Sequence, residues 1–230
     1  MRGILVFVFL LNTPIAFCQI SAEEAYKGII PGEYNSPERM HRWMMDVYQD
    51  RWEPLPNGIQ SKWYSFGIAA SRMIDIPLNK RSTIAFAFGP GIGSHNVHHN
   101  GAFTNTIDTS GIRRYRIEPL PTGYSYKRNK IRLTLIELPF QLRIRSKRDG
   151  FFFYPGFKAG WLVGNHSLIV DDQGKYKRYN YKGFEKLQYG PTLHMGYNRL
   201  ALYAYYSLTP VMKEGEDFRT FSIGLSLNFF

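Results

Sequence analysis

The sequence has 230 residues, a formal net charge of +11 and a mean hydropathy of −0.30. No stretch reaches the ~18 apolar residues that a membrane helix needs, so a helical membrane protein is excluded. A barrel of alternating strands remains open, because alternation averages to an unremarkable hydropathy. The positive charge could suit nucleic acid, but the basic residues gather between the expected strands and form no single patch. In an exported protein such residues meet lipid phosphates instead.

The first 18 residues have the pattern of a secretory signal peptide. Arg2 supplies the positive charge, Ile4–Leu11 the apolar core and Ala16–Cys18 a small-x-small cleavage site. A lipoprotein with Cys18 acylated as its first mature residue is the alternative, which the bulky Phe17 disfavours. Cleavage after Cys18 leaves a mature chain without cysteine, and therefore without disulfides, thiolate catalysis or Cys-based metal sites.

Residues 19–39 are expected to form a flexible periplasmic segment, since they carry Gly and Pro without a lasting period. Residues 40–50 are ambiguous, because their apolar side chains fit both a helical spacing and an alternating one. Seven expected strands follow, and bacterial single-chain barrels have an even number of strands. The even count favours a strand over a helix for residues 40–50.

Seven segments downstream show apolar residues at every second position. The expected strands are 62–76, 84–93, 131–144, 151–164, 187–197, 200–209 and 217–230. Strict alternation indicates strands whose two faces have different surroundings. In a soluble protein the apolar terminal strand would be an aggregation-prone edge. In a closed barrel it is paired on both sides, and its Phe229-Phe230 end lies at the membrane interface, with Phe229 in phase and Phe230 one position beyond.

Two details refine this barrel. In residues 84–93 one face is bulky and the other holds only Ala and Gly, as suits the narrow interior of about eight strands. In residues 131–144 the apolar phase shifts by one position, which predicts a β-bulge around Ile136-Glu137. Connections also alternate in length: 77–81, 146–150 and 198–199 are short, while 96–129, 165–185 and 210–216 are expected as longer loops. Outer-membrane barrels show this asymmetry. We therefore expect an all-β, eight-stranded antiparallel transmembrane β-barrel of the outer-membrane type over residues 40–230.

Four short motifs carry a resemblance to a known family. They are Arg72–Lys80, Gly89–Gly93, Ile136–Pro139 and Tyr154–Lys158. With them, residues 40–230 resemble the PorT-like group of outer-membrane β-barrel proteins. The resemblance implies the barrel fold, and it implies a link to type IX protein secretion, the role of the best-studied members.

Several polar residues are expected on interior faces: Arg42, Asp46, Glu137, Arg143, Lys158 and His194. Such charges could line a pathway or bind a ligand. Unpaired buried charge is costly, however, which favours a satisfied salt-bridge network that plugs the interior. A solute pore is not expected in so narrow a barrel.

Three histidines invite a chemical interpretation. His95, His98 and His99 could bind a metal, but Asp108 is the nearest carboxylate in sequence, which favours exposed loop histidines without a ligand. Ser94 and His95 with Asp108 could form a lipid hydrolase constellation, although nothing fixes their geometry. We expect no catalytic, cofactor-binding or metal-binding residues.

Basic residues in the expected long loops could contact lipopolysaccharide phosphates, with plain solvation as the equal alternative. These residues are Arg113, Arg114, Arg116, Lys175, Lys177 and Arg178. The expected function is that of a non-enzymatic outer-membrane protein, an interaction or accessory component of the envelope with lipid and protein partners and no nucleic acid. A lipid-modifying hydrolase or acyltransferase, a structural barrel that binds lipopolysaccharide, and a soluble β-barrel around an apolar ligand remain alternatives. The soluble barrel would turn its bulky residues inward.

Overall fold

The computed structural model describes residues 42–79, 83–107, 109, 111, 113–121, 123–146, 150–213 and 215–229. The expected signal peptide (1–18), the segment 19–39 and Phe230 lie outside the described residues. The first described element is β1 (Trp43–Glu53), so the strand interpretation of residues 40–50 is confirmed for its part from Trp43 onward, while residues 40 and 41 lie outside the described residues. Among the described residues, no helix has the length and apolarity to cross a membrane.

The remaining elements are all strands. They are β2 (Phe66–Arg72), β3 (Ile74–Pro77), β4 (Ile84–Phe88), β5 (Gly91–His98), β6 (Gly101–Ile107), β7 (Arg113–Pro119), β8 (Tyr126–Arg145), β9 (Phe151–Asp171), β10 (Lys175–Tyr179), β11 (Leu187–Tyr197), β12 (Leu200–Tyr206) and β13 (Arg219–Phe229).

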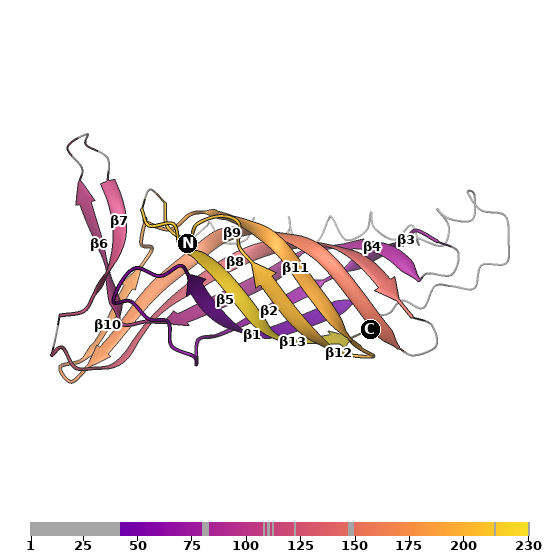
Figure 1. Ribbon diagram of the computed structural model, residues 1–230, viewed down its shortest axis with the longest axis horizontal. Coiled ribbons are helices and arrows are strands. Elements are labelled where there is room, and N and C mark those ends of the chain that lie inside the picture. Colours follow the sequence, from indigo (N-terminus) through magenta and orange to yellow (C-terminus); the bar gives the residue numbers. More distant parts are fainter. Residues whose placement is uncertain are drawn as a thin grey trace, which may run out of the picture. The chain divides into compact units, whose positions relative to one another are not determined.

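Antiparallel pairing closes these strands into a ring of eight (Figure 1). β13 pairs with both β12 and β1, and β8 pairs with β9 to complete the circle. β2 and β3 together fill one place in the ring, interrupted at Met73, and β4 and β5 fill the next, interrupted at Gly89-Pro90. Pro90 lacks an N–H to donate, and the backbone of Arg72 leaves no room for a Cβ at Gly89. The eight-stranded antiparallel barrel predicted from the sequence is confirmed.

The outward face of the ring is an apolar belt. Ile84, Phe86, Leu193 and Leu225 are 36–50% exposed, which is the reverse of a soluble barrel with its bulky residues inside. On β8 the belt runs from Ile136 to Ile144, roughly 27 Å along the strand at ~3.4 Å per residue. At the ~35–45° tilt of such strands this length spans roughly 20 Å of height, close to the ~25 Å apolar band of outer-membrane barrels.

A charge placed in the middle of this belt tests the membrane interpretation. We expect Leu225→Arg to lower the free energy of unfolding by ~2–4 kcal/mol in lipid vesicles, because Leu225 lies midway along the outward row of β13. Tyr197→Arg, next to a turn at the end of β11, should cost only ~0–1 kcal/mol, since it lies near the interface. Equal costs for the two variants in urea unfolding would contradict the belt.

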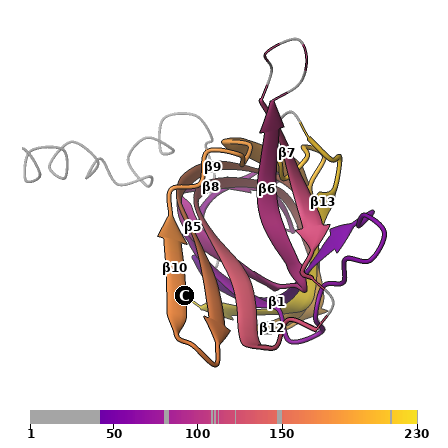
Figure 2. The same cartoon turned by 90° about the vertical axis from the view of Figure 1, so that its left-hand side faces the viewer.

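One end of the barrel carries more structure than the sequence indicates. The expected loop 96–129 contains the end of β5, the hairpin β6–β7 and the start of β8, and the expected loop 165–185 contains the end of β9 and β10. These strands lie together at one end of the barrel, on the left of Figure 1 and facing the viewer in Figure 2. Outside lipid, a strand needs no apolar outer face, so the alternation that marks the belt is missing there.

The predicted bulge near Ile136-Glu137 is wrong. Buried residues follow every second position of β8 without a slip, so Ile131, Leu133 and Leu135 point inward in phase with Glu137. The bulge lies in β9 instead: Thr134 pairs with Gly164 while Leu135 pairs with Leu162, which leaves Val163 as the extra residue. The apolar positions shift phase along the sequence because the outer part of the interior is apolar. Ile131, Leu133 and Leu135 face that interior, whereas the large apolar residues from Ile136 onward face outward.

Candidate functional site

The barrel interior is filled by two layers of side chains, and the first is apolar. It is a cluster near the end that carries β6, β7 and β10, which we call the outer end. Its buried members are Trp52, Ile59, Val97, Ile117, Ile131, Leu133, Leu135, Tyr181, Phe184, Val211, Met212 and Phe218. Trp52 and Phe218 pack with ring centroids 4.9 Å apart, and Trp52 is fully buried. This layer closes the barrel with hydrocarbon rather than water.

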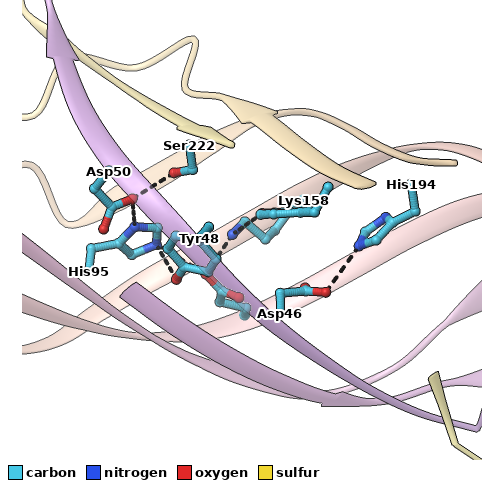
Figure 3. Close-up of polar contacts among 9 residues, drawn as sticks. Asp46, Tyr48, Asp50, His95, Lys158, His194 and Ser222 are labelled. Carbon is cyan, nitrogen blue, oxygen red and sulfur yellow. Dashed lines mark hydrogen bonds and ion pairs between the residues drawn. The ribbon is translucent and has the colours of Figure 1, made fainter. Parts of the chain in front are cut away.

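The second layer is a polar network in the middle of the barrel (Figure 3). Lys158 Nζ lies 2.8 Å from Glu137 Oε1 and 3.2 Å from the hydroxyl of Tyr203. The same ammonium group lies 4.2 Å from the centroid of the Tyr205 ring, a cation–π contact. Both charged residues are buried, so each depends on the other for compensation.

His95 links this ion pair to a second carboxylate. Its Nδ1 donates to Asp50 Oδ1 at 2.9 Å, and its Nε2 lies 3.6 Å from Glu137 Oε1 and 3.3 Å from the hydroxyl of Tyr48. Ser222 Oγ donates to the same Asp50 oxygen at 2.7 Å. The serine therefore binds the carboxylate rather than the imidazole, so these residues do not form a nucleophile–base pair.

A further group lies toward the opposite end. Gln141 Nε2 donates to His194 Nδ1 at 3.2 Å, and His194 Nε2 lies 3.3 Å from Asp46 Oδ1, so both ring nitrogens have a partner. Arg143 donates through Nε to Gln141 Oε1 at 3.1 Å. It also donates to Asp75 Oδ1 at 2.6 Å, and Asp75 binds a second guanidinium, that of Arg145.

The structure places the interior residues predicted from the sequence in different ways. Asp46, Glu137, Arg143, Lys158 and His194 are buried in the network. Arg42 is exposed, because it lies before the first residue of β1 at the end of the barrel. Sequence reasoning missed Asp50, Asp75 and His95. Asp50 is in phase with Asp46 and Tyr48 on β1, so following that alternation from Asp46 to the end of the segment 40–50 would have found it.

The family comparison agrees with this architecture. Residues 45–213 match the model of the outer membrane protein β-barrel domain family. The chain belongs to this family. Family membership puts the barrel in an outer membrane, whereas the PorT-like group is a finer assignment and stays a prediction.

The fold also resembles that of a solved structure at low identity. The crystal structure of Ail, the attachment invasion locus protein of Yersinia pestis, aligns at 9% identity with a TM-score of 0.43, covering 83% of this chain and 97% of that chain. No curated protein sequence matches the chain significantly.

As a barrel of this family, the chain separates the three histidines that the sequence brought together. His95 points into the polar network. The ring centroid of His99 lies 5.8 Å from that of Trp52, inside the barrel. His98 lies on the outward face, with its ring centroid 4.9 Å from that of Tyr64. The expectation of exposed loop histidines is thus wrong for His95 and His99, both of which are buried. Within the described ranges, no group of three or more His, Cys, Asp or Glu side chains is arranged to hold a metal ion.

The hydrolase constellation is not assembled either. Ser94 and His95 are neighbours on β5, so their side chains point to opposite faces of the strand. His95 is directed to Asp50 inside the barrel and Ser94 to the outside. Asp108 lies outside the described residues.

The basic residues predicted to contact lipopolysaccharide lie on strands rather than loops. Arg113, Arg114 and Arg116 belong to β7, and Lys175, Lys177 and Arg178 belong to β10. All six are exposed, and they sit in two different sheets. Next to β10 is a pocket of about 240 Å³ lined by Phe103, Tyr176, Lys177, Arg178 and Tyr181 among others. Contact of these residues with lipid stays a prediction.

The outer end should loosen in acid because of His99. Burial lowers the pKa of His99 from 6.5 to about 4, and its Nδ1 accepts a hydrogen bond from the Gly101 backbone at 3.2 Å. A lowered pKa stabilises the fold above pH 6.5, and this contribution is lost as the pH falls from 6.5 toward 4. The full loss is about 3 kcal/mol at 1.36 kcal/mol per pKa unit.

Proteolysis of the β6–β7 hairpin and tryptophan fluorescence between pH 7 and pH 4 would measure this loosening. His99→Phe keeps the ring packing and should remove most of the pH dependence. His98→Asn, one residue earlier on the outward face, should retain it. An unchanged pH profile in His99→Phe would contradict the assignment.

Proposed function

We propose that the chain is a closed, non-enzymatic outer-membrane barrel that conducts no solutes and acts through partners bound at its outer end. The filled interior carries this proposal. Trp52 and the apolar layer block the barrel at one level, and the Glu137–Lys158 network blocks it at another. An eight-stranded barrel is only just wide enough for such side chains, which leaves no room for a water-filled path.

The outer end offers a surface that differs from the belt. β6 and β7 form a separate two-stranded sheet, and Ile107 at its far end is 66% exposed, opposite Arg113. Ile107 and its basic neighbours offer a protein partner both apolar area and positive charge outside the lipid. An accessory role in an envelope complex fits such a surface. The PorT-like resemblance suggests a secretion complex as its form.

Planar bilayer recordings of the purified full-length chain test the closed barrel. We expect no stepwise conductance, with insertion verified by resistance to SDS before heating. Reproducible conductance steps from the folded protein would refute the proposal.

Photocrosslinking in cells tests whether a protein partner binds at the outer end. A photoreactive amino acid at position 107 should give a discrete protein adduct. The same residue at position 225, in the middle of the belt, should give none, because it faces lipid. Absence of any adduct at position 107 and its neighbours would exclude a partner at this surface. Identification of the adduct by mass spectrometry would show whether it is a secretion component.

A further inference from the structure

The outward row of β8 changes its chemistry at one level. From Ile144 to Ile136 every outward side chain is apolar, Thr134 follows, and the next three are Arg132, Lys130 and Arg128. The change comes where the strand leaves the hydrocarbon, which is the level of lipid phosphates.

Neighbouring strands extend this cationic row sideways. On β9, His166 pairs with Arg132 and Leu168 pairs with Lys130, and on β10 Lys177 pairs with Leu168 from the other side. On β5, Asn96 accepts a hydrogen bond from Arg132 Nε at 2.8 Å, which orients the guanidinium. We call Arg128, Lys130, Arg132 and Lys177 the basic band.

No acidic partner balances the basic band. Among the residues that the structure describes, no carboxylate lies within ion-pair distance of its four cations. The opposite flank of the barrel differs at the same end. There Arg51 on β1 lies 3.3 Å from Glu53, and Arg219 on β13 lies 3.1 Å from Asp217. On the flank of the basic band, Lys127 at the strand end pairs with Asp172 at 3.2 Å, whereas the four exposed or half-buried cations of the band have no ion pair within the described part of the chain. Four such cations side by side point to an external anion.

We propose that the basic band binds the phosphate groups of lipopolysaccharide in the outer leaflet, with the lipid's acyl chains on the belt directly below. Arg132 supplies the planar, two-donor group that suits a phosphate, and the lysines supply point charges. Trp161 pairs with Ile136 beneath the basic band, and both exposed side chains give the acyl chains an apolar surface to pack against. The proposal rests on the outer-membrane location and is independent of whether a protein partner binds at β6–β7.

The test compares two charge-matched double variants of the full-length protein in detergent micelles. Lys130→Gln/Arg132→Gln removes two cations of the basic band, and Arg51→Gln/Arg219→Gln removes two paired cations from the other flank. Binding of bis-phosphorylated lipid A and of dephosphorylated lipid A is measured by native mass spectrometry at low and high salt. We expect the first variant to bind phosphorylated lipid A roughly 10-fold more weakly or worse, since each cation near lipid phosphates contributes ~1 kcal/mol.

The control variant should bind like the wild type, and dephosphorylated lipid A should bind weakly to all three proteins. Equal binding of both lipids, or equal weakening by both double variants, would overturn the proposal. Displacement of the lipid by millimolar inorganic phosphate would show a site for free anion instead. If Lys130→Gln/Arg132→Gln fails to fold, Lys177→Gln on β10, outside the ring, gives the same comparison, and unchanged binding there would also overturn it.

Discussion

Lys158→Met should destabilise the folded barrel by about 3–5 kcal/mol, because it leaves the buried Glu137 carboxylate without its cation. Methionine keeps most of the volume of the lysine chain, so the expected loss is electrostatic rather than a packing defect. His95 lies 3.6 Å from Glu137 but already donates to Asp50, and it cannot replace the ammonium group fully. Urea unfolding in lipid vesicles, followed by tryptophan fluorescence, measures the change.

A double variant separates the loss of the charge from a packing defect. Glu137→Gln/Lys158→Met removes both charges and should recover most of the stability lost in Lys158→Met, because replacing a buried ion pair with neutral groups is often nearly neutral. Stability of Lys158→Met within 1 kcal/mol of the wild type would mean that the pair does not hold the interior together. Failure of the double variant to recover would place the loss in packing.

Gly93→Val should prevent folding or lower the free energy of unfolding by ~3 kcal/mol or more, since it overfills the interior around Glu137. A Cβ at Gly93 would lie 2.5 Å from Glu137 Oε1 and 2.7 Å from Glu137 Cδ. The carboxylate would have to leave its contact with Lys158, which adds the cost of a broken buried pair to that of overpacking. Heat-dependent mobility on SDS gels, which distinguishes folded from unfolded barrels, gives a direct readout.

The matched control is Gly164→Val. Gly164 is also a strand glycine, but nothing lies within 4 Å of the position that a Cβ would take. Gly164→Val should therefore fold like the wild type. Comparable folding of Gly93→Val and Gly164→Val would show that the network has room to spare.

The belt and the ring were predictable because lipid imposes strict alternation on every strand that it touches. Phe221 to Phe229 and Ile84 to Phe88 show this pattern plainly in the sequence, and both form strands of the ring. Closure by eight strands followed from the even count that made residues 40–50 a strand. Inward charges such as Glu137 and Lys158 were found because they interrupt an otherwise apolar or small inner face.

The outer end was not predictable by the same means. There water lies outside the strands and hydrocarbon fills the inside, so Leu133 and Ile131 reverse the rule that apolar residues face outward. Arg113 to Pro119 alternates too little to indicate a strand, and its pairing with β6 depends on partners far away in space. The network partners Asp75 and Arg145 lie close to expected turns, where a single sequence gives no sign of an inward direction.

The length of β8 and β9 has a consequence for the cell surface. Tyr126 lies ten residues beyond the top of the belt at Ile136, which is roughly 34 Å of strand at ~3.4 Å per residue. Short turns of such barrels face the periplasm, so this stalk rises from the exterior side. We therefore expect its tip to lie beyond the lipid headgroups, where an extracellular macromolecule can contact it without touching the bilayer.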